Sequence, residues 1–175
     1  MRILITGASG SGTSTLGAAL ASSKGWSPVD ADDYYWLPTD PPYQEARDHG
    51  ARLQMILDEL GRHETSVVSG SIMNWGAELE DSLALIVFLY VDAAIRVERL
   101  RVREQQKLGH ADPEFLAWAA DYDTGPTGGR SLAKHEAWLA ARKCKVLRLE
   151  GDLTVERRVE LVSDALSELP SSQRQ

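Results

Sequence analysis

The 175-residue sequence contains a single cysteine, Cys144. One cysteine excludes a disulfide within the chain and argues against a metal cluster held by thiolates. The histidines do not offer an alternative, because none has the spacing of a zinc motif: they are His49, His63, His110 and His135. We interpret them as surface or core residues. The cysteine usage fits a reducing compartment, so we expect a cytoplasmic location.

Long apolar runs and an export signal are also missing. The longest apolar run, LALIVFLYV at 83–91, is far shorter than the roughly 20 residues that a membrane-spanning helix needs. Met1 leads directly into RILITG, without the apolar segment and small-residue cleavage site of a signal peptide. We therefore expect no membrane among the partners.

Positive charge is scarce. The 19 Lys and Arg residues face 26 Asp and Glu residues, which gives a net charge of -7. Nucleic acids and anionic membranes are bound through basic surfaces, so this balance argues against both as partners. A small phosphorylated ligand stays compatible with it, because such a ligand responds to the local field. The sequence gives no indication of the oligomeric state.

The sequence does contain a regular alternation of strands and helices. Strands are expected at 2–6, in a short segment that ends near residue 30, and at 65–71, 83–91 and 145–151. Helices are expected at 13–21, through 53–61, at 93–107, from 113, at 131–141 and from 155 to 169. Because 83–91 is apolar on both faces, we predict an α/β fold with a parallel sheet between two helix layers. We expect one domain at 1–169 and a frayed tail at 170–175.

The first glycine-rich stretch, GASGSGTST at 7–15, matches the phosphate-binding P-loop G-x-x-x-x-G-K-[ST] at every specified position but one. Thr13 stands where the lysine belongs. In a P-loop the backbone N–H groups surround a phosphate, and the following helix adds partial positive charge. We therefore expect these residues to bind nucleotide phosphates: Gly7, Ser9, Gly10, Ser11, Gly12, Thr13, Ser14 and Thr15.

A dinucleotide-binding Rossmann loop is the alternative explanation of the same glycines. Its G-x-G-x-x-G pattern, begun at Gly10, would need glycine where Thr15 stands. Asp30 does lie about where the ribose-binding acid of such a loop is found. No tyrosine is followed by lysine four residues later, as in short-chain dehydrogenases. We prefer the P-loop and keep an NAD(P)-binding Rossmann protein as a second alternative.

Two further polar clusters follow the second and third predicted strands. Asp30, Asp32 and Asp33 lie in DADDYYW, and Gly70 and Ser71 lie in SGSIMNWG. The carboxyl ends of parallel strands meet at one edge of the sheet, so both clusters should lie near the glycine-rich stretch. The aspartates could serve phosphoryl transfer, or they could belong to a solvated loop or a helix cap.

An arginine stripe lies on one face of the helix expected at 93–107. Arg96, Arg99 and Arg103 recur at i, i+3 and i+7 within RVERLRVRE. Guanidinium groups bind phosphates with two parallel hydrogen bonds, so such a stripe suits a triphosphate. The alternative is a salt-bridged surface that includes Glu98 and Glu104.

The segments GASGSGTST, DADDYYW, SGSIMNWG, RVERLRVRE and RSLAKHEAWL together resemble the P-loop small-molecule and nucleotide kinases, the adenylate-kinase-like and shikimate-kinase-like group. The chain is similar over nearly its whole length to a bacterial branch often labelled adenylate-kinase-related or DNA-topology-modulation proteins. The resemblance implies the P-loop NTPase fold with strand order 2-3-1-4-5. It also implies ATP or GTP with Mg²⁺ as phosphoryl donor, a nucleotide or small metabolite as acceptor, and an arginine-bearing lid, which we place at about 93–142.

The same resemblance implies roles for individual residues. Ser14 corresponds to the hydroxyl that binds Mg²⁺. Asp30 and Asp32 match an Asp-x-Asp in which one carboxylate holds the metal or the substrate and one accepts the hydroxyl proton. We predict Asp30, Asp32, Arg96, Arg99 and Arg130 as catalytic residues, Ser14 and Asp32 as metal ligands, and Arg99 and Arg103 as further nucleotide contacts.

The acceptor is expected beside the second and third strands. Small residues there let a substrate approach the backbone, and aromatic rings could stack on a base. The predicted acceptor contacts are Asp33, Tyr34, Trp36, Gly70, Ser71, Asn74 and Trp75. Trp36 and Trp75 could instead fill the core.

Thr13 leaves the loop without its usual cation. Losing one preorganised contact of this kind costs roughly 10²–10³ in rate. We hypothesise that phosphate binding survives and that lid arginines, chiefly Arg96, Arg99 or Arg130, provide part of the missing charge. The alternative hypothesis is a nucleotide-binding regulatory protein with negligible turnover.

Overall fold

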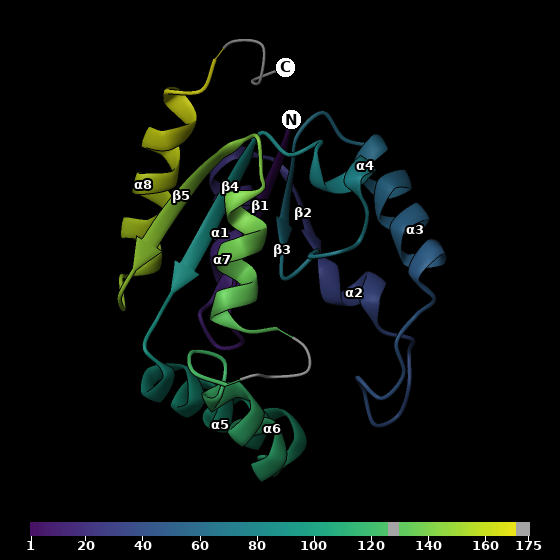
Figure 1. The fold of residues 1–175 in the computed structure, drawn as a ribbon, viewed down its shortest axis with the longest axis vertical. Helices are drawn as coiled ribbons and strands as arrows, with labels where there is room; N and C mark the ends of the chain where they lie inside the picture. The colour runs from purple at the N-terminus through teal and green to yellow at the C-terminus, as the bar shows by residue number, and fades with distance from the viewer. Residues whose placement is uncertain (126–129, 171–175) are drawn as a thin grey trace.

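The computed structural model describes residues 1–125 and 130–170, and a five-stranded parallel sheet lies at its centre (Figure 1). The strands are β1 (Arg2–Gly7), β2 (Ser27–Asp30), β3 (Ser66–Ser69), β4 (Leu85–Tyr90) and β5 (Lys145–Glu150). Their order is β2-β3-β1-β4-β5, and every neighbouring pair is parallel. The predicted fold class and strand order are confirmed.

Helices fill the connections between the strands. They are α1 (Thr13–Lys24), α2 (Ala31–Tyr35), α3 (His49–Gly61), α4 (Ala77–Glu80), α5 (Ala93–Leu108), α6 (Pro113–Ala120), α7 (Leu132–Ala140) and α8 (Val155–Ser167). The helix α1 runs three residues beyond its predicted end, and Gly25 stops it in a left-handed conformation with φ of 67°. The sequence prediction lacks α2 and α4, because helices this short show no helical period.

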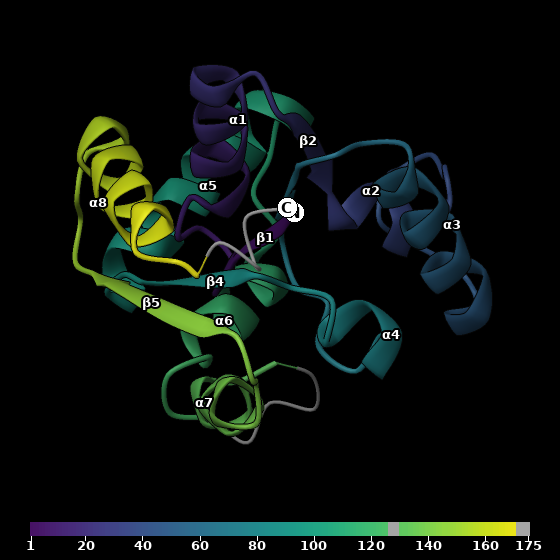
Figure 2. The same ribbon diagram turned by 90° about the horizontal axis from the view of Figure 1, so that it is seen from above.

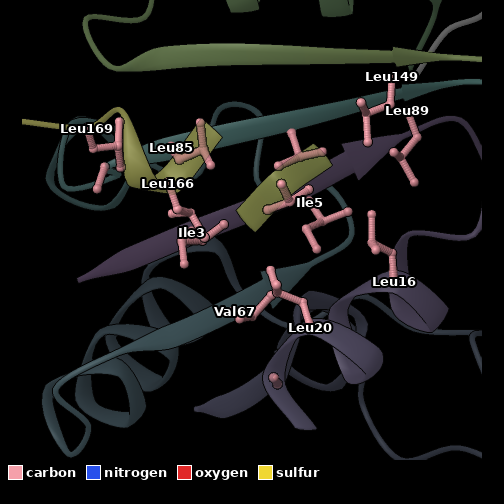
Figure 3. Close-up of a cluster of buried hydrophobic side chains, with 14 residues drawn as sticks. Ile3, Ile5, Leu16, Leu20, Val67, Leu85, Leu89, Leu149, Leu166 and Leu169 are labelled. Carbon is pink, nitrogen blue, oxygen red and sulfur yellow. The ribbon is translucent and has the colours of Figure 1, made fainter. Parts of the chain in front are cut away.

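Alternate residues of the central strands face the two helix layers, as the period of a strand requires. Ile3 and Ile5 of β1 face α1 and α8, where they pack with Leu16, Leu20 and Leu166 (Figure 3). Figure 2 shows α1 and α8 on the same side of the sheet. This packing fixes the start of α1, and with it the end of the glycine-rich stretch.

The opposite face of the sheet is covered by α3, α4 and α7. Leu4 and Phe88 pack there with Ile56, Leu79 and Trp138. The helix α7 therefore packs on the core through Trp138 and Leu139, and the lid at about 93–142 stays a prediction. The helices α5 and α6 lie beyond the carboxyl end of β4 (Figure 1).

Some predicted boundaries have no counterpart in the described residues. Residues 171–175 of the predicted tail, and 126–129 of the lid predicted at about 93–142, lie outside them. The extent of the single domain, 1–169, stays a prediction. None of the helices within 1–125 and 130–170 has the length and apolar composition needed to cross a bilayer.

The strand order excludes the Rossmann alternative. In the Rossmann order 3-2-1-4-5-6, β2 lies next to β1. Here β3 lies between them and pairs with both, with Val67 opposite Ile3 and Pro28. The second alternative, an NAD(P)-binding Rossmann protein, is therefore wrong.

A buried histidine joins α7 to the strand that leads into the glycine-rich stretch. The ring nitrogens of His135 lie 2.6 Å from Tyr122 Oη and 3.2 Å from Thr6 Oγ1. Burial, with the positive charge of Arg130, lowers the pKa of His135 to about 4. The imidazole is therefore neutral at pH 7, and it can donate to one hydroxyl and accept from the other.

This histidine should make the free energy of unfolding depend on pH. Its pKa is about 4 in the folded protein and near 6.5 in an unfolded chain. The unfolded state therefore binds the proton first as the pH falls. The stabilisation is complete above about pH 6.5 and is lost as the pH falls toward 4, where the loss reaches roughly 3 kcal/mol.

Urea unfolding at several pH values tests this expectation. The variant His135→Gln should show a flatter dependence than the wild type between about pH 7 and pH 4. His110→Gln is the control, because His110 is exposed and should leave the dependence unchanged. Parallel curves for the wild type and His135→Gln would show that His135 is not responsible.

Candidate functional site

The glycine loop, residues 7–15, leads from β1 into α1 at the carboxyl edge of the sheet. Gly12 is the N-cap of α1, with φ of 94°, and within the described part of the chain no side chain caps this helix. The first N–H groups of α1 are therefore available to a ligand, and the helix dipole adds partial positive charge. Ser14 and Thr15 in the first turn are exposed. This arrangement can bind an anionic group.

Two glycines of this loop leave no room for a side chain. A Cβ on Gly7 would lie 2.5 Å from the carbonyl oxygen of Leu89 and 2.7 Å from Ser11 Oγ. Gly10 has φ of 83°, and its Cβ would lie 2.6 Å from the carbonyl oxygen of Arg96. The backbone of β4 and α5 thus lies directly against the loop and restricts its path.

Arg96 is buried, and its guanidinium binds backbone carbonyls and one carboxylate. Its side chain is 1% exposed, and its Nε donates to the Val91 carbonyl at 2.8 Å. Its Nη1 donates to the carbonyls of Ala119 and Ser9 at 3.1 and 3.4 Å, and its Nη2 pairs with Asp123 at 3.2 Å. This geometry does not support the prediction that Arg96 moves with a lid onto nucleotide phosphates. The guanidinium instead joins the glycine loop to α5 and α6.

The other two arginines of the stripe have different neighbours. Arg99 forms an ion pair with Asp152, which follows β5. Arg103 pairs with Glu104 at 2.9 Å, and its positive charge offsets part of the rise in the pKa of Asp32 that surrounding protein atoms and Asp30 cause. The salt bridges that were the alternative for this helix therefore occur, and Arg103 also acts on the aspartate cluster.

The three aspartates after β2 differ in their hydrogen bonds and exposure. Asp30 is the N-cap of α2, and its Oδ1 accepts the N–H of Asp32 at 3.1 Å. The helix cap that was the alternative for these aspartates is thus present at Asp30. Asp32 and Asp33 lie in the first turn of α2, and both are solvent-accessible. Surrounding protein atoms and the charge of Asp30 raise the pKa of both carboxyls.

Asp32 is also close to positive charge from two other parts of the chain. The surrounding protein atoms and the charge of Asp30 raise the pKa of this carboxyl, and the positive charges of Arg130 and Arg103 offset part of that rise. The guanidinium of Arg130 lies over the ring of Trp118 in α6, 5.8 Å from its centroid. The positive charges of Arg103 in α5 and of Arg130 before α7 therefore act on the carboxylate of Asp32.

A surface cavity of about 360 Å³ lies beside α2. Its lining includes the carboxylates of Asp32 and Asp33, the rings of Trp36 and Tyr43, and Arg47. The guanidinium of Arg47 donates to the carbonyls of Tyr34 and Trp36 at 3.1 and 3.3 Å, which fixes the wall of the cavity. Of the predicted acceptor contacts, Asp33 and Trp36 line this cavity.

The segment after β3 reaches the aspartates through Gly70. This residue has φ of 106°, and a Cβ on it would lie 3.2 Å from Ala31 Cβ and 3.8 Å from Asp30 Oδ1. The predicted meeting of the second and third polar clusters is therefore observed. Ser71 is partly exposed. Asn74 is exposed, and its carbonyl accepts from His49 Nε2 at 2.8 Å.

Trp75 is a core residue. It is 2% exposed and its ring stacks on Tyr35 with centroids 6.2 Å apart, so it fills the core, as the alternative for this residue expected, and its burial does not favour a contact with the acceptor. Arg52 of α3 lies over both rings, 5.0 Å from the centroid of Trp75 and 4.7 Å from that of Tyr35. Arg52 could not be singled out from the sequence, because nothing in the helical pattern distinguishes this half-buried arginine from an exposed one.

Arg158 of α8 was also missed. It is 3% exposed, and its guanidinium donates to the carbonyls of Ser11 at 2.9 Å and Gly151 at 3.2 Å. The sequence held a signal, because position 158 lies three residues after Val155 and four before Val162, on the apolar stripe of the helix. An arginine on such a stripe needs buried polar partners, and the glycine loop offers one.

The available oxygen ligands fit a metal ion that arrives with a nucleotide. Across residues 1–125 and 130–170, no group of three or more His, Cys, Asp or Glu side chains could hold a metal by itself. Mg²⁺ bound to a nucleotide needs only one or two protein oxygens besides phosphates and waters. The exposed hydroxyl of Ser14 and the accessible carboxylate of Asp32 are oxygens of this kind.

Comparisons with known proteins agree with this architecture. A family model described as an AAA domain matches residues 3–114. The "Uncharacterized protein YqaC" of Bacillus subtilis (strain 168) is 39% identical, over 94% of this chain and 97% of that protein.

Several solved structures of similar fold are described as kinases. A shikimate kinase from Bacteroides thetaiotaomicron superposes with a TM-score of 0.61 at 20% identity, over 95% of this chain and 98% of that one. A deoxyadenosine kinase from M. mycoides with bound dATP gives 0.61 at 13% identity, over 96% and 100%. A gluconokinase from Sinorhizobium meliloti 1021 gives 0.58 at 20% identity, over 95% and 91%. By the matched family model, the chain belongs to the AAA-domain family, and its fold is that of the P-loop small-molecule kinases.

Proposed function

We propose that the protein is a kinase that binds ATP or GTP with Mg²⁺ at the glycine loop and transfers phosphate to a nucleotide or small metabolite. One observation carries this proposal. Asp32 borders the cavity beside α2, lies at the same sheet edge as the glycine loop, and is influenced by Arg103 and Arg130. A carboxylate, an anion-binding loop and two guanidinium groups are the parts that phosphoryl transfer uses.

In the proposed reaction the acceptor hydroxyl oxygen forms a bond to the γ-phosphorus. The bond from the γ-phosphorus to the bridging oxygen breaks, and the nucleoside diphosphate leaves with the electron pair. The hydroxyl proton passes to a carboxylate. We assign this role to Asp32, because the side chain of Asp30 already accepts a backbone N–H at the start of α2. Mg²⁺, when bound with the nucleotide, neutralises phosphate charge.

The cavity beside α2 is the proposed acceptor site. Trp36 and Tyr43 offer ring faces with centroids 6.0 Å apart, and Asp32 and Asp33 offer carboxylates. Rings bind the apolar or planar part of a ligand, and carboxylates accept hydrogen bonds from hydroxyl groups. A hydroxylated metabolite or a nucleoside fits this chemistry.

Thermal unfolding with a panel of nucleotides tests the proposal. A ligand that binds only the folded state at about 100 times its Kd adds roughly 2.7 kcal/mol of stability. For a chain of this size that corresponds to a rise in Tm of roughly 5–10 °C. We expect this rise with Mg–ATP or Mg–GTP and little change with the unphosphorylated nucleosides.

Single-turnover assays with bound nucleotide and candidate acceptors complete the test. Loss of the γ-phosphate to an acceptor supports the kinase. Binding without any transfer would favour the alternative, a nucleotide-binding regulatory protein. The absence of a Tm shift with every nucleoside triphosphate would refute the proposal.

A further inference from the structure

The glycine loop contains no charged side chain, since GASGSGTST has Thr13 in place of the P-loop lysine. In an ordinary P-loop that lysine reaches the β- and γ-phosphates. A loop without it keeps only backbone dipoles, so any other positive charge must come from elements that pack against the loop.

Arg158 is buried against the tip of the loop. Its Nη1 donates to the carbonyl of Ser11 at 2.9 Å, and a Cβ on Gly12 would lie 3.2 Å from the same nitrogen. Its Nη2 donates to the carbonyl of Gly151 at 3.2 Å. Thus α8 places a guanidinium directly behind the residues that begin α1.

No carboxylate of the described residues forms an ion pair with this guanidinium. Asp152, the acid whose charge reaches it, is paired with Arg99 instead. The group of Arg99, Arg158 and Asp152 therefore carries one net positive charge. Arg158 Nε is buried and has no hydrogen-bond partner among the described residues. A buried charge without a counter-ion is costly, and an anion at the loop would offset this cost.

The contact with Ser11 also sets the direction of an N–H group. In a trans peptide the carbonyl oxygen and the following N–H point in opposite directions. Because the Ser11 carbonyl points to Arg158, the N–H of Gly12 points away from it. Arg96 Nη1 donates to the Ser9 carbonyl at 3.4 Å, so the N–H of Gly10 points away from Arg96 in the same way. Two buried arginines thus bind loop carbonyls, and the N–H groups that follow these carbonyls point to the opposite side of the loop.

We infer that Arg158 replaces the missing P-loop lysine in phosphate binding: it orients the loop amides and adds positive charge from behind them. It is a positioning residue, because it contacts the loop carbonyl and not the phosphate. This inference rests on the proposed function, since it concerns the same nucleotide.

Calorimetric affinities of variants test the inference. Arg158→Met should weaken binding of Mg–ATP roughly 10–100-fold, as expected for losing a hydrogen bond to a charged group. The loss should shrink from ATP to ADP to AMP, because it depends on phosphate charge. Arg157→Met is the matched control, since Arg157 is the exposed neighbour on α8 and pairs with Glu160.

The substitution Thr13→Lys separates charge from structural damage. In the Arg158→Met background it should recover at least about tenfold in affinity, and in the wild type it should change affinity less than about threefold. Equal gains in both backgrounds, or unchanged ATP binding by Arg158→Met, would overturn the inference. If Arg158→Met does not fold, Arg158→Gln keeps a donor for Ser11 without the charge, and a smaller loss of affinity that still shrinks from ATP to ADP to AMP is expected. If the wild-type protein binds no nucleotide, both the proposed function and this inference are wrong. If the wild type binds nucleotide and the Arg158 variants bind it equally well, only this inference is wrong.

Discussion

Replacing Asp32 by asparagine is expected to lower the rate of phosphoryl transfer by roughly 10²–10⁴-fold, the usual contribution of a proton-accepting group. Asparagine has the same shape but cannot accept the hydroxyl proton. Nucleotide affinity should change little, because Asp32 lines the proposed acceptor cavity, whereas the glycine loop is the proposed phosphate site. Single-turnover rates and calorimetric affinities measure the two effects separately.

The neighbouring aspartates are the matched controls for this prediction. Asp30→Asn keeps the helix cap, since asparagine caps helices as well as aspartate does. Asp33→Asn removes a charge from the same cavity wall. A rate loss at Asp33 or Asp30 that equals the loss at Asp32 would contradict the assignment of the base. Recovery of the Asp32→Asn rate at high Mg²⁺ would show that Asp32 holds the metal instead.

Replacing Glu80 by alanine is expected to reduce the free energy of unfolding by roughly 3–5 kcal/mol, as for other buried ion pairs that lose one partner. Glu80 is 7% exposed, and its Oε2 accepts from Trp138 Nε1 and Arg142 Nη1, each at 2.7 Å. Its Oε1 accepts from the N–H of Trp75 at 3.0 Å. Alanine would leave all three donors buried or half-buried without this acceptor.

Urea unfolding near pH 7 measures this effect. Glu78→Ala is the control, because Glu78 lies on the same short helix α4 and is exposed. Glu80→Gln should cost less than Glu80→Ala, since the amide oxygen still accepts one of the donors. A loss of less than about 1 kcal/mol for Glu80→Ala would mean that the network is not a major source of stability.

The strands and the glycine loop could be predicted because each is a local signal. The apolar runs at 2–6 and 83–91 give strands, and GASGSGTST gives the turn that begins a helix. The position of Asp30 beside Gly70 followed from topology alone, since parallel strands end at one edge. The meeting of these two segments at one edge of the sheet was therefore predictable.

The use of single side chains was not predictable. Arg96 and Arg99 share a helical face in the sequence, yet one is buried against Ser9 and Ala119 and the other pairs with Asp152. The neighbours of these two arginines depend on how α5 packs against α6 and on the path of the loop after β5. Trp75 likewise enters the core because Arg52 and Tyr35 cover it. These are contacts between distant segments, which spacing within one helix cannot show.

The guanidinium of Arg96 connects the glycine loop to α6. It holds the Ser9 carbonyl of the glycine loop, the Ala119 carbonyl at the end of α6, and the carboxylate of Asp123. A shift of α6 would have to break or stretch these bonds, and a ligand that reshapes the loop would act on the same bonds. Thermodynamic linkage is reciprocal. If a ligand moves α6 when it binds the loop, then holding α6 in its present position must weaken binding of that ligand by the same free energy.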